Sequence, residues 1–136
     1  LILQRLNNPA TYGRLRLIGY ALSSKMELLA DGRACVISLS LEELKRFNFK
    51  KGDTECLVNY GLSIQGVIMA AFIREDENLV KMSFRSVGEM DVNQFARTYF
   101  NGGGHIRAAG GASETSLDET LEKFKNAVNE IEAQLI

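Results

Sequence analysis

In the stretch Gln65–Arg85, QGVIMAAFIREDENLVKMSFR, two strand-like segments lie on either side of a polar turn. An apolar run comes first, then a short polar segment, then an alternation of apolar and polar side chains, which together predict a β-hairpin. The predicted strands are residues 65–73 and 79–85. Because side chains alternate between the faces of a strand, Lys81, Ser83 and Arg85 should share one basic, hydroxyl-bearing face.

Helix and strand signals continue on both sides of this hairpin. Apolar residues recur at helical spacing within residues 11–29, which predicts a helix, and the β-branched run 34–39 predicts a strand. Four further helices are expected after the capping residues Ser40, Asp53, Asp91 and Ser116. No repeat or linker separates these elements. The sequence therefore predicts a mixed α/β fold, a single domain in which helices flank a mixed sheet that contains a hairpin.

Composition places the chain among ordinary globular domains. Its 136 residues are 46% hydrophobic and 24% charged, which suits one packed domain. No apolar run approaches the roughly 20 residues that cross a bilayer, so no membrane partner is expected. Cys35 and Cys56 lie in apolar stretches and should be reduced thiols in the core, which favours a cytoplasmic protein. A net charge of −1 argues against coating of long nucleic acids and favours a short anionic ligand.

The first ten residues differ from the rest. Pro9 interrupts residues 1–10, which we expect to be the end of an upstream element. The chain begins at Leu1 without the features of a signal peptide. We therefore expect it to be a piece of a longer protein.

The strongest chemical signal is the segment Asn101–Gly111, NGGGHIRAAGG, which holds five of the twelve glycines and the only histidine. Glycines allow backbone amides to converge into a concave nest that binds an anionic oxygen. A phosphate is the natural ligand of such a nest. The alternative interpretation is a long glycine-rich connection between a helix that ends near Phe100 and a short strand over residues 108–112.

Three cationic side chains could complete a phosphate site. His105 could donate to a phosphate oxygen, or it could be a buried neutral histidine that is bonded to the backbone. Arg85 beside Ser86 offers bidentate recognition of a phosphate, or it is a solvated edge-strand arginine. Arg107 is either a second cationic contact or a surface residue. Phosphoester hydrolysis generally needs metal-activated water, and the sequence has no cluster of metal ligands, so it indicates recognition of an anion more strongly than turnover.

These motifs resemble a known family. The GGGH element ending at His105, the Ala108-Ala109-Gly110 segment after it and Arg85-Ser86 upstream are similar to the DHH-associated domain of bacterial DHH phosphoesterases, above all the NrnA-like group. Residues 52–60 also fit, and the resemblance covers nearly the whole chain. In that family an N-terminal domain carries an Asp-His-His motif and binds two manganese ions, while the C-terminal domain holds the substrate.

The resemblance implies that residues 11–136 are the substrate-binding domain of a manganese-dependent phosphoesterase and that residues 1–10 end the inter-domain linker. Its partners would be a short oligoribonucleotide or phosphorylated nucleotide and the N-terminal DHH domain of the parent chain. A chain with one histidine has no Asp-His-His motif, so we assign it no catalytic residue and no metal and expect it to be inactive alone. The implied substrate-binding residues are Arg85, Ser86, Gly102, Gly103, Gly104, His105 and Arg107.

Two other functions stay open at this stage. The same domain occurs in alanyl-tRNA synthetases, which suggests a nucleic-acid-binding module without hydrolase activity, although the acidic balance argues against broad tRNA binding. A regulatory sensor of phosphorylated nucleotides is a third function. Asn101 stands where the family often has a further glycine, Cys56 stands where a smaller residue is common, and Arg107 occupies a variable position. These differences affect the substrate detail.

Overall fold

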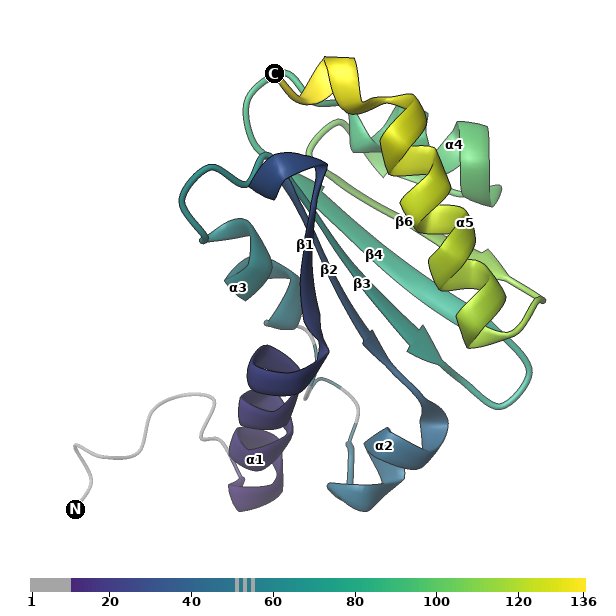
Figure 1. The fold of residues 1–136 in the computed structure, drawn as a ribbon. Helices are drawn as coiled ribbons and strands as arrows, with labels where there is room; N and C mark the ends of the chain where they lie inside the picture. Colours follow the sequence, from purple (N-terminus) through teal and green to yellow (C-terminus); the bar gives the residue numbers. More distant parts are fainter. Residues whose placement is uncertain (1–10, 51, 53, 55) are drawn as a thin grey trace.

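A mixed sheet forms the middle layer of the computed structural model, which describes residues 11–50, 52, 54 and 56–136 (Figure 1). Within these residues six strands are ordered β1-β2-β3-β4-β6-β5, and only β2 and β3 run parallel to each other. The strands are β1 Met26–Leu29, β2 Ala34–Leu39, β3 Met69–Glu75, β4 Val80–Ser86, β5 Gly103–His105 and β6 Ala108–Ser113. The predicted mixed α/β class and the predicted β3–β4 hairpin are confirmed.

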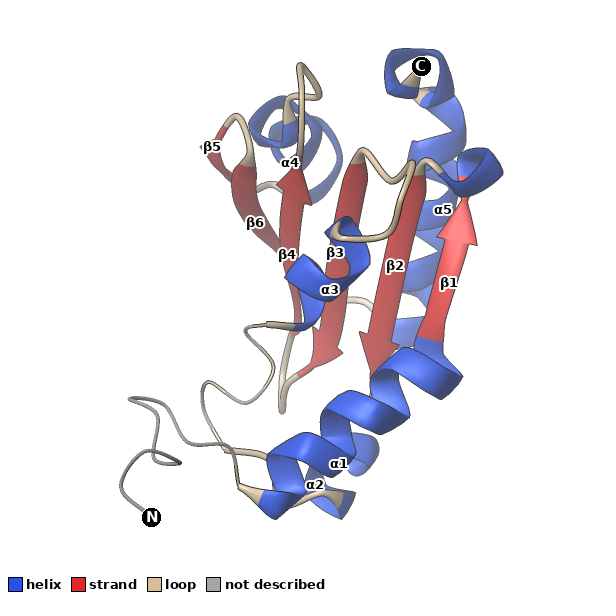
Figure 2. Ribbon diagram, turned by 90° about the vertical axis from the view of Figure 1, so that its left-hand side faces the viewer, coloured by secondary structure: helices blue, strands red, loops and turns tan. Residues whose placement is uncertain are grey.

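Helices cover the two faces of the sheet unequally. The helices are α1 Tyr12–Tyr20, α2 Leu41–Arg46, α3 Leu57–Leu62, α4 Val92–Phe100 and α5 Leu117–Glu130, with a π-helical turn over Ala21–Lys25 and 3₁₀ turns over Ala30–Gly32 and Glu132–Leu135. Residues of α4 and α5 belong to one buried cluster, and residues of α1, α2 and α3 to another. In Figure 2, α3 lies in front of β3 and reaches β4, while β6 and β5 extend beyond it without a helix in front.

Side-chain caps begin the helices where the sequence predicts them. The Ser40 hydroxyl accepts from the amide of Glu43 at 3.1 Å, and the Glu43 carboxylate accepts from the amide of Ser40 at 2.8 Å. Asp91 caps α4, and Ser116 caps α5, each by accepting an amide three residues ahead. The predicted cap Asp53 lies outside the described residues.

The predicted helix over residues 11–29 is wrong in its second half. The α-helix ends at Tyr20, and Met26–Leu29 forms strand β1 instead. β1 pairs antiparallel with β2, with Met26 opposite Ile37 and Leu29 opposite Ala34. Asp31, at φ 56°, turns the chain between the two strands. Backbone pairing with a neighbouring strand therefore overrides the helical spacing of the apolar residues.

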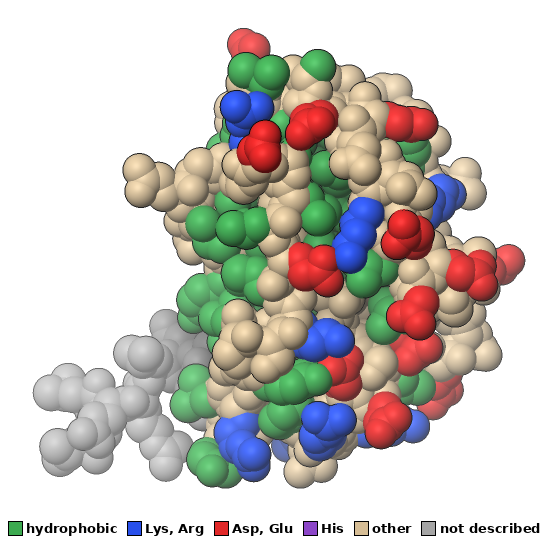
Figure 3. Space-filling view, viewed as in Figure 1, with side chains coloured by type: hydrophobic (Ala, Val, Ile, Leu, Met, Phe, Trp, Pro, Cys, Tyr) green, Lys and Arg blue, Asp and Glu red, His purple; other side chains and the backbone are tan. Residues whose placement is uncertain are grey.

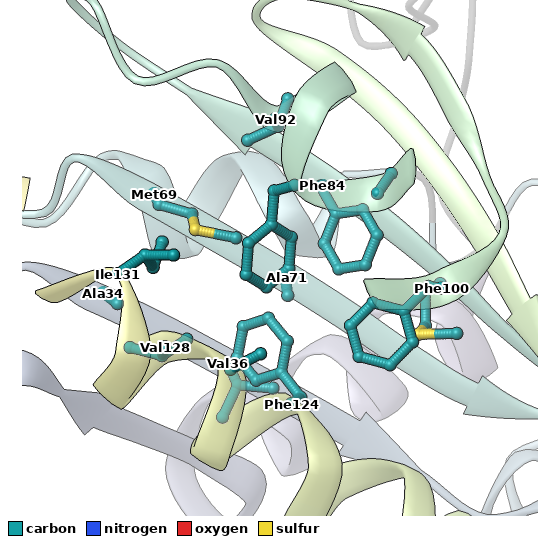
Figure 4. Packing of buried hydrophobic residues seen from close by; sticks show 14 of the residues in the cluster. Ala34, Val36, Met69, Ala71, Phe84, Val92, Phe100, Phe124, Val128 and Ile131 are labelled. Carbon is teal, nitrogen blue, oxygen red and sulfur yellow. The ribbon is translucent and has the colours of Figure 1, made fainter. Parts of the chain in front are cut away.

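The first buried cluster is built around β4 and is rich in aromatic rings. Phe84 is fully buried, and its ring centroid lies 5.4 Å from that of Phe95, 5.7 Å from that of Phe100 and 6.1 Å from that of Phe124. Figure 4 shows the rings of Phe84, Phe100 and Phe124 together at the centre of this cluster. This face of β4 therefore carries much of the packing that holds α4 and α5 on the sheet.

The two cysteines are free thiols. Cys35 is buried, as predicted, and burial raises its pKa to about 11, so the thiol is protonated at neutral pH. Cys56 is only half-buried, in the turn before α3. Neither thiol carries a disulfide that would hold the fold together.

The visible surface carries mixed charge. Figure 3 shows Asp and Glu side chains interspersed with Lys and Arg over the face that includes α5. This mixture agrees with the net charge of −1. It gives this face no uniform field that would attract a long polyanion.

Candidate functional site

Three neighbouring strands bring Arg85 and His105 into one row across the sheet. Arg85 of β4 pairs with Ala108 of β6, and Ala108 pairs with His105 of β5. Side chains of directly paired residues point to the same face of a sheet, so Arg85 and His105 share a face with Ala108 between them. The register thus brings together two predicted site residues that are twenty positions apart in the sequence.

This row lies on the side of the sheet that carries α3, which contacts β4 but leaves part of this face open. Val80, Met82 and Phe84 are buried on the other face, and Lys81 and Ser83 are exposed with Arg85 half-buried, so the predicted alternation is confirmed. Among the residues that the structure describes, Arg85 forms no ion pair. A half-buried guanidinium without a carboxylate partner is available to bind an anion.

A groove runs along this open face. It has a volume of about 680 Å³, and the residues that line it include Phe49, Phe72, Arg74, Lys81, Ser83 and Arg85. A second cavity of about 360 Å³ shares four of these residues and extends over Gly110 and Ala112 of β6. The two cavities together make one open depression with three cations along it.

Ser86 does not lie beside the Arg85 guanidinium. Neighbouring residues on a strand point to opposite faces, and Ser86 is 3% exposed on the core side. Its hydroxyl donates to the carbonyl of Met90 at 2.6 Å and lies 3.3 Å from the carbonyl of Ile106. The predicted position of Ser86 beside the guanidinium is therefore wrong. Ser86 instead links β4 to the loop before α4 and to the β5–β6 turn.

The glycines of the GGGH element let β5 approach its neighbours closely. A side chain at Gly102 would place its Cβ 1.9 Å from the carbonyl oxygen of Gly110, and one at Gly104 would lie 2.7 Å from that of Ala108. Gly104 also has φ 156°. The three predicted loop residues therefore form the end of a connection and an edge strand, in which close contact requires glycine.

Two of the three glycine amides are already used inside the protein, so the predicted amide nest is not formed by all three. Gly102 donates to the carbonyl of Ala96 at 3.1 Å, and Gly104 donates to Oδ1 of Asn93 at 2.9 Å. Asn93 Oδ1 also accepts from Nε of Arg97 at 3.1 Å. The sequence reasoning missed Asn93, although its i,i+4 spacing to Arg97 on a predicted helix was a usable signal.

His105 and Arg107 flank the turn between β5 and β6, and both are exposed. The alternative of a buried histidine is therefore wrong. Arg107 donates from Nε to the carbonyl of Gly88 at 3.2 Å, which ties the turn to the loop before α4. His105 is thus left at the open end of the row that begins at Arg85.

The DHHA1 domain model matches residues 32–135. The chain belongs to the DHHA1 domain family. This result confirms the resemblance to a DHH-associated domain that the GGGH element and the upstream Arg-Ser pair indicate.

This DHHA1 domain is similar to several longer proteins. It is 40% identical to an exopolyphosphatase-related protein from Bacteroides fragilis, with a TM-score of 0.90 over 98% of this chain and 39% of that protein. It is 33% identical over 91 residues to the bifunctional oligoribonuclease and PAP phosphatase NrnA of Bacillus subtilis, over 67% of this chain and 28% of that protein. NrnA of Thermus thermophilus is also 33% identical, over 57% of this chain and 24% of that protein.

The DHHA1 domain therefore spans about a quarter of the curated relatives that it matches. In the part of the chain that the structure describes, no group of three or more His, Cys, Asp or Glu side chains could hold a metal ion. None of the helices over the same residues is both long and apolar enough to cross a membrane.

Proposed function

We propose that this DHHA1 domain holds the terminal phosphate of a short oligoribonucleotide or phosphorylated nucleotide for a parent phosphoesterase of the NrnA type. One observation carries the proposal, namely the cross-strand row from Arg85 through Ala108 to His105 on the open face of the sheet. The relatives named as oligoribonuclease and PAP phosphatase support the class of substrate. The proposed substrate-binding domain is residues 11–136 of a cytoplasmic protein, with residues 1–10 as the end of the linker.

The row suits a phosphate because its middle position is small. Neighbouring strands lie about 4.8 Å apart, so Arg85 and His105 stand roughly 10 Å apart across Ala108. A methyl group between them leaves room for a ligand above the sheet. The Arg85 guanidinium then donates two parallel hydrogen bonds to phosphate oxygens, and the His105 imidazole donates from the other side.

Other predicted residues act through this pair. Ser86 donates to the carbonyl of Ile106 in the β5–β6 turn, and Arg107 of that turn donates to the carbonyl of Gly88. Gly102 and Gly104 allow β5 to lie close to β6. Gly103 completes the strand that presents His105. We therefore assign direct phosphate contact to Arg85 and His105 and a positioning role to the others.

Hydrolysis belongs to the parent protein in this proposal. The described residues do not fit a metal site, so we derive no metal-dependent step through this chain. The two manganese ions that the family resemblance implies would be held by the parent's N-terminal DHH domain, where they supply activated water for phosphoester cleavage. The chain's own contribution is to bind and orient the phosphate of the substrate.

Titration of AMP into the 136-residue chain, followed by NMR, tests this function. Arg85→Ala should weaken AMP binding at least about tenfold, because a charge-assisted bidentate contact is worth about 1.5 to 3 kcal/mol. Arg46→Ala removes the same charge from α2, where Arg46 stacks over Tyr20, and should leave binding unchanged. Unchanged affinity in Arg85→Ala, with or without a lower melting temperature, would show that the site is wrongly assigned.

The alternative of a tRNA-type module gives a different salt dependence. A ligand held by one or two phosphate contacts loses affinity only slightly as salt rises, whereas a many-phosphate binder loses it steeply. A steep salt slope with a 5′-phosphorylated RNA would therefore favour the nucleic-acid-binding module over the phosphoesterase domain.

A further inference from the structure

The polar face of β4 continues past Arg85 toward the β3–β4 turn. Arg85, Ser83 and Lys81 follow one another on the open face at every second residue. Two residues of an extended strand advance by about 7 Å, so these side chains repeat at intervals of about 7 Å. An extended sugar–phosphate unit of a single-stranded nucleic acid is about as long as two residues of a strand, and proteins bind such strands along basic grooves.

The neighbouring strand leaves room for a ligand beside this row. Arg85, Ser83 and Lys81 pair with Ala108, Gly110 and Ala112 of β6 in that order. Of these small residues, Gly110 and Ala112 line the second cavity next to Ser83 and Lys81. A chain of nucleotides that lies along β4 would therefore meet polar side chains on one side and no bulky side chain on the other.

The far end of the row already holds an anion, which is one of the protein's own carboxylates. Arg74 and Lys81 are directly paired across β3 and β4, and like charges in this position repel each other. Asp76 Oδ2 lies 3.3 Å from Lys81 Nζ and 3.7 Å from Arg74 Nη1. The amide of Glu77 and then Lys81 hold the pKa of Asp76 below its usual range. Two cations thus converge on a position that an anionic oxygen occupies.

We propose that Lys81, with Arg74 beside it, is a subsite for a third phosphate along a short oligoribonucleotide whose terminal phosphate lies at Arg85. Ser83, midway between them, would donate its hydroxyl to the intervening phosphate. This inference rests on the proposed function. It assigns the domain a preference for 5′-phosphorylated chains of three nucleotides over mononucleotides, because only the longer chain reaches Lys81 and displaces Asp76.

The test compares 5′-phosphorylated tri-, di- and monoadenylate as ligands of the 136-residue chain. The triadenylate should bind more tightly than AMP. Lys81→Ala should weaken triadenylate binding about three- to fivefold, as for a partly exposed ion pair, and should leave AMP binding unchanged. The same variant should reduce the salt slope for the triadenylate by about 0.7, the value for one phosphate contact on a single strand.

Two further variants complete the design. Lys45→Ala removes an exposed lysine from α2, away from the groove, and should alter binding of none of the three ligands. Asp76→Asn removes the competing charge but keeps an oxygen that can accept from the amide of Glu77, as Asp76 Oδ1 does at 2.9 Å. It should strengthen triadenylate binding and leave AMP binding unchanged.

The outcomes separate this inference from the function on which it rests. If Lys81→Ala weakens all three ligands equally, or if the triadenylate binds no more tightly than AMP while Arg85→Ala still weakens AMP, the third-phosphate subsite is wrong and the proposed function stands. If Arg85→Ala changes none of the three affinities, or no ligand binds, both fail.

Discussion

The two faces of β4 serve opposite purposes. On one face Val80, Met82 and Phe84 are at most 4% exposed and hold α4 and α5 on the sheet. On the other face Lys81 and Ser83 are exposed and line a groove. A single strand therefore carries the packing core and the candidate binding surface, separated only by the alternation of side chains.

The same contrast explains why polar groups on the open face lower the free energy of unfolding only slightly. Exposed cations keep their hydration, and their replacement removes little packing. Replacement of a buried aromatic side chain destabilises the fold, since it leaves a cavity among rings that contact one another. Function and stability should therefore respond independently to substitutions at adjacent positions of β4.

The largest effect is expected on the buried face. Phe84→Ala should lower the free energy of unfolding by about 3 to 5 kcal/mol, because Phe84 is fully buried between three other rings. Lys81→Ala, three positions earlier on the open face, should change it by no more than about 0.5 kcal/mol. Urea denaturation of both variants measures the difference, and similar losses in the two would contradict the division of β4 into two faces.

The next effect concerns the edge of the open face, where β5 meets β6. Gly102→Ala should lower the free energy of unfolding by about 1 to 3 kcal/mol, because the new Cβ would lie 1.9 Å from the carbonyl oxygen of Gly110 and β5 must shift. Gly19→Ala on α1 is the matched control, since nothing lies within 4 Å of its Cβ, and alanine there should stabilise the helix slightly. Thermal melts of both variants give the comparison, and equal melting temperatures would overturn it.

A smaller effect is expected from coupling across the row. Arg85→Ala and His105→Ala should each weaken AMP binding, and the double variant should lose less than the sum by about 0.5 to 2 kcal/mol, as expected for groups that bind one phosphate. Arg85→Lys should restore affinity only in part, because an ammonium lacks the planar fork. Strict additivity of the two losses would place the residues in separate sites.

The sequence predicted much of this arrangement where local rules apply. The alternation along β4, the hairpin with β3 and the caps at Ser40, Asp91 and Ser116 follow from spacing alone, and all are confirmed. The same period-two rule could have shown that Ser86 points away from Arg85.

Three features depend on tertiary contacts that local sequence patterns do not predict. β1 forms because β2 offers it a partner, against a helical pattern in its own sequence. The amides of Gly102 and Gly104 are used by Ala96 and Asn93 of α4, a contact that no spacing within the glycine segment reveals. The groove also depends on Phe49 and Arg74, which only the fold brings next to Arg85.

The smallest effect is expected where α1 and α2 pack together, on the side of the sheet that also carries the groove. Glu43 of α2 is 8% exposed, accepts from the hydroxyl of Tyr20 at the end of α1 and forms an ion pair with Lys25 at 3.3 Å. Burial alone would raise the pKa of Glu43. The amide of Ser40, the Tyr20 hydroxyl and Lys25 outweigh burial and hold this pKa below its usual value.

A lowered folded-state pKa fixes the sign of the pH dependence. The ionised Glu43 stabilises the fold fully above the unfolded-state pKa of about 4.3, and this contribution is lost as pH falls through the lower folded-state pKa. Glu43→Gln keeps the capping geometry but removes the charge, so it should cost about 0.5 to 1 kcal/mol at neutral pH and less at pH 3. Glu42→Gln, on the same helix but exposed, is the control and should change the pH profile little. Denaturation between pH 3 and 7 measures both, and a Glu43→Gln deficit that stays constant or grows toward low pH would show that the charge of Glu43 does not stabilise the packing of α1 and α2.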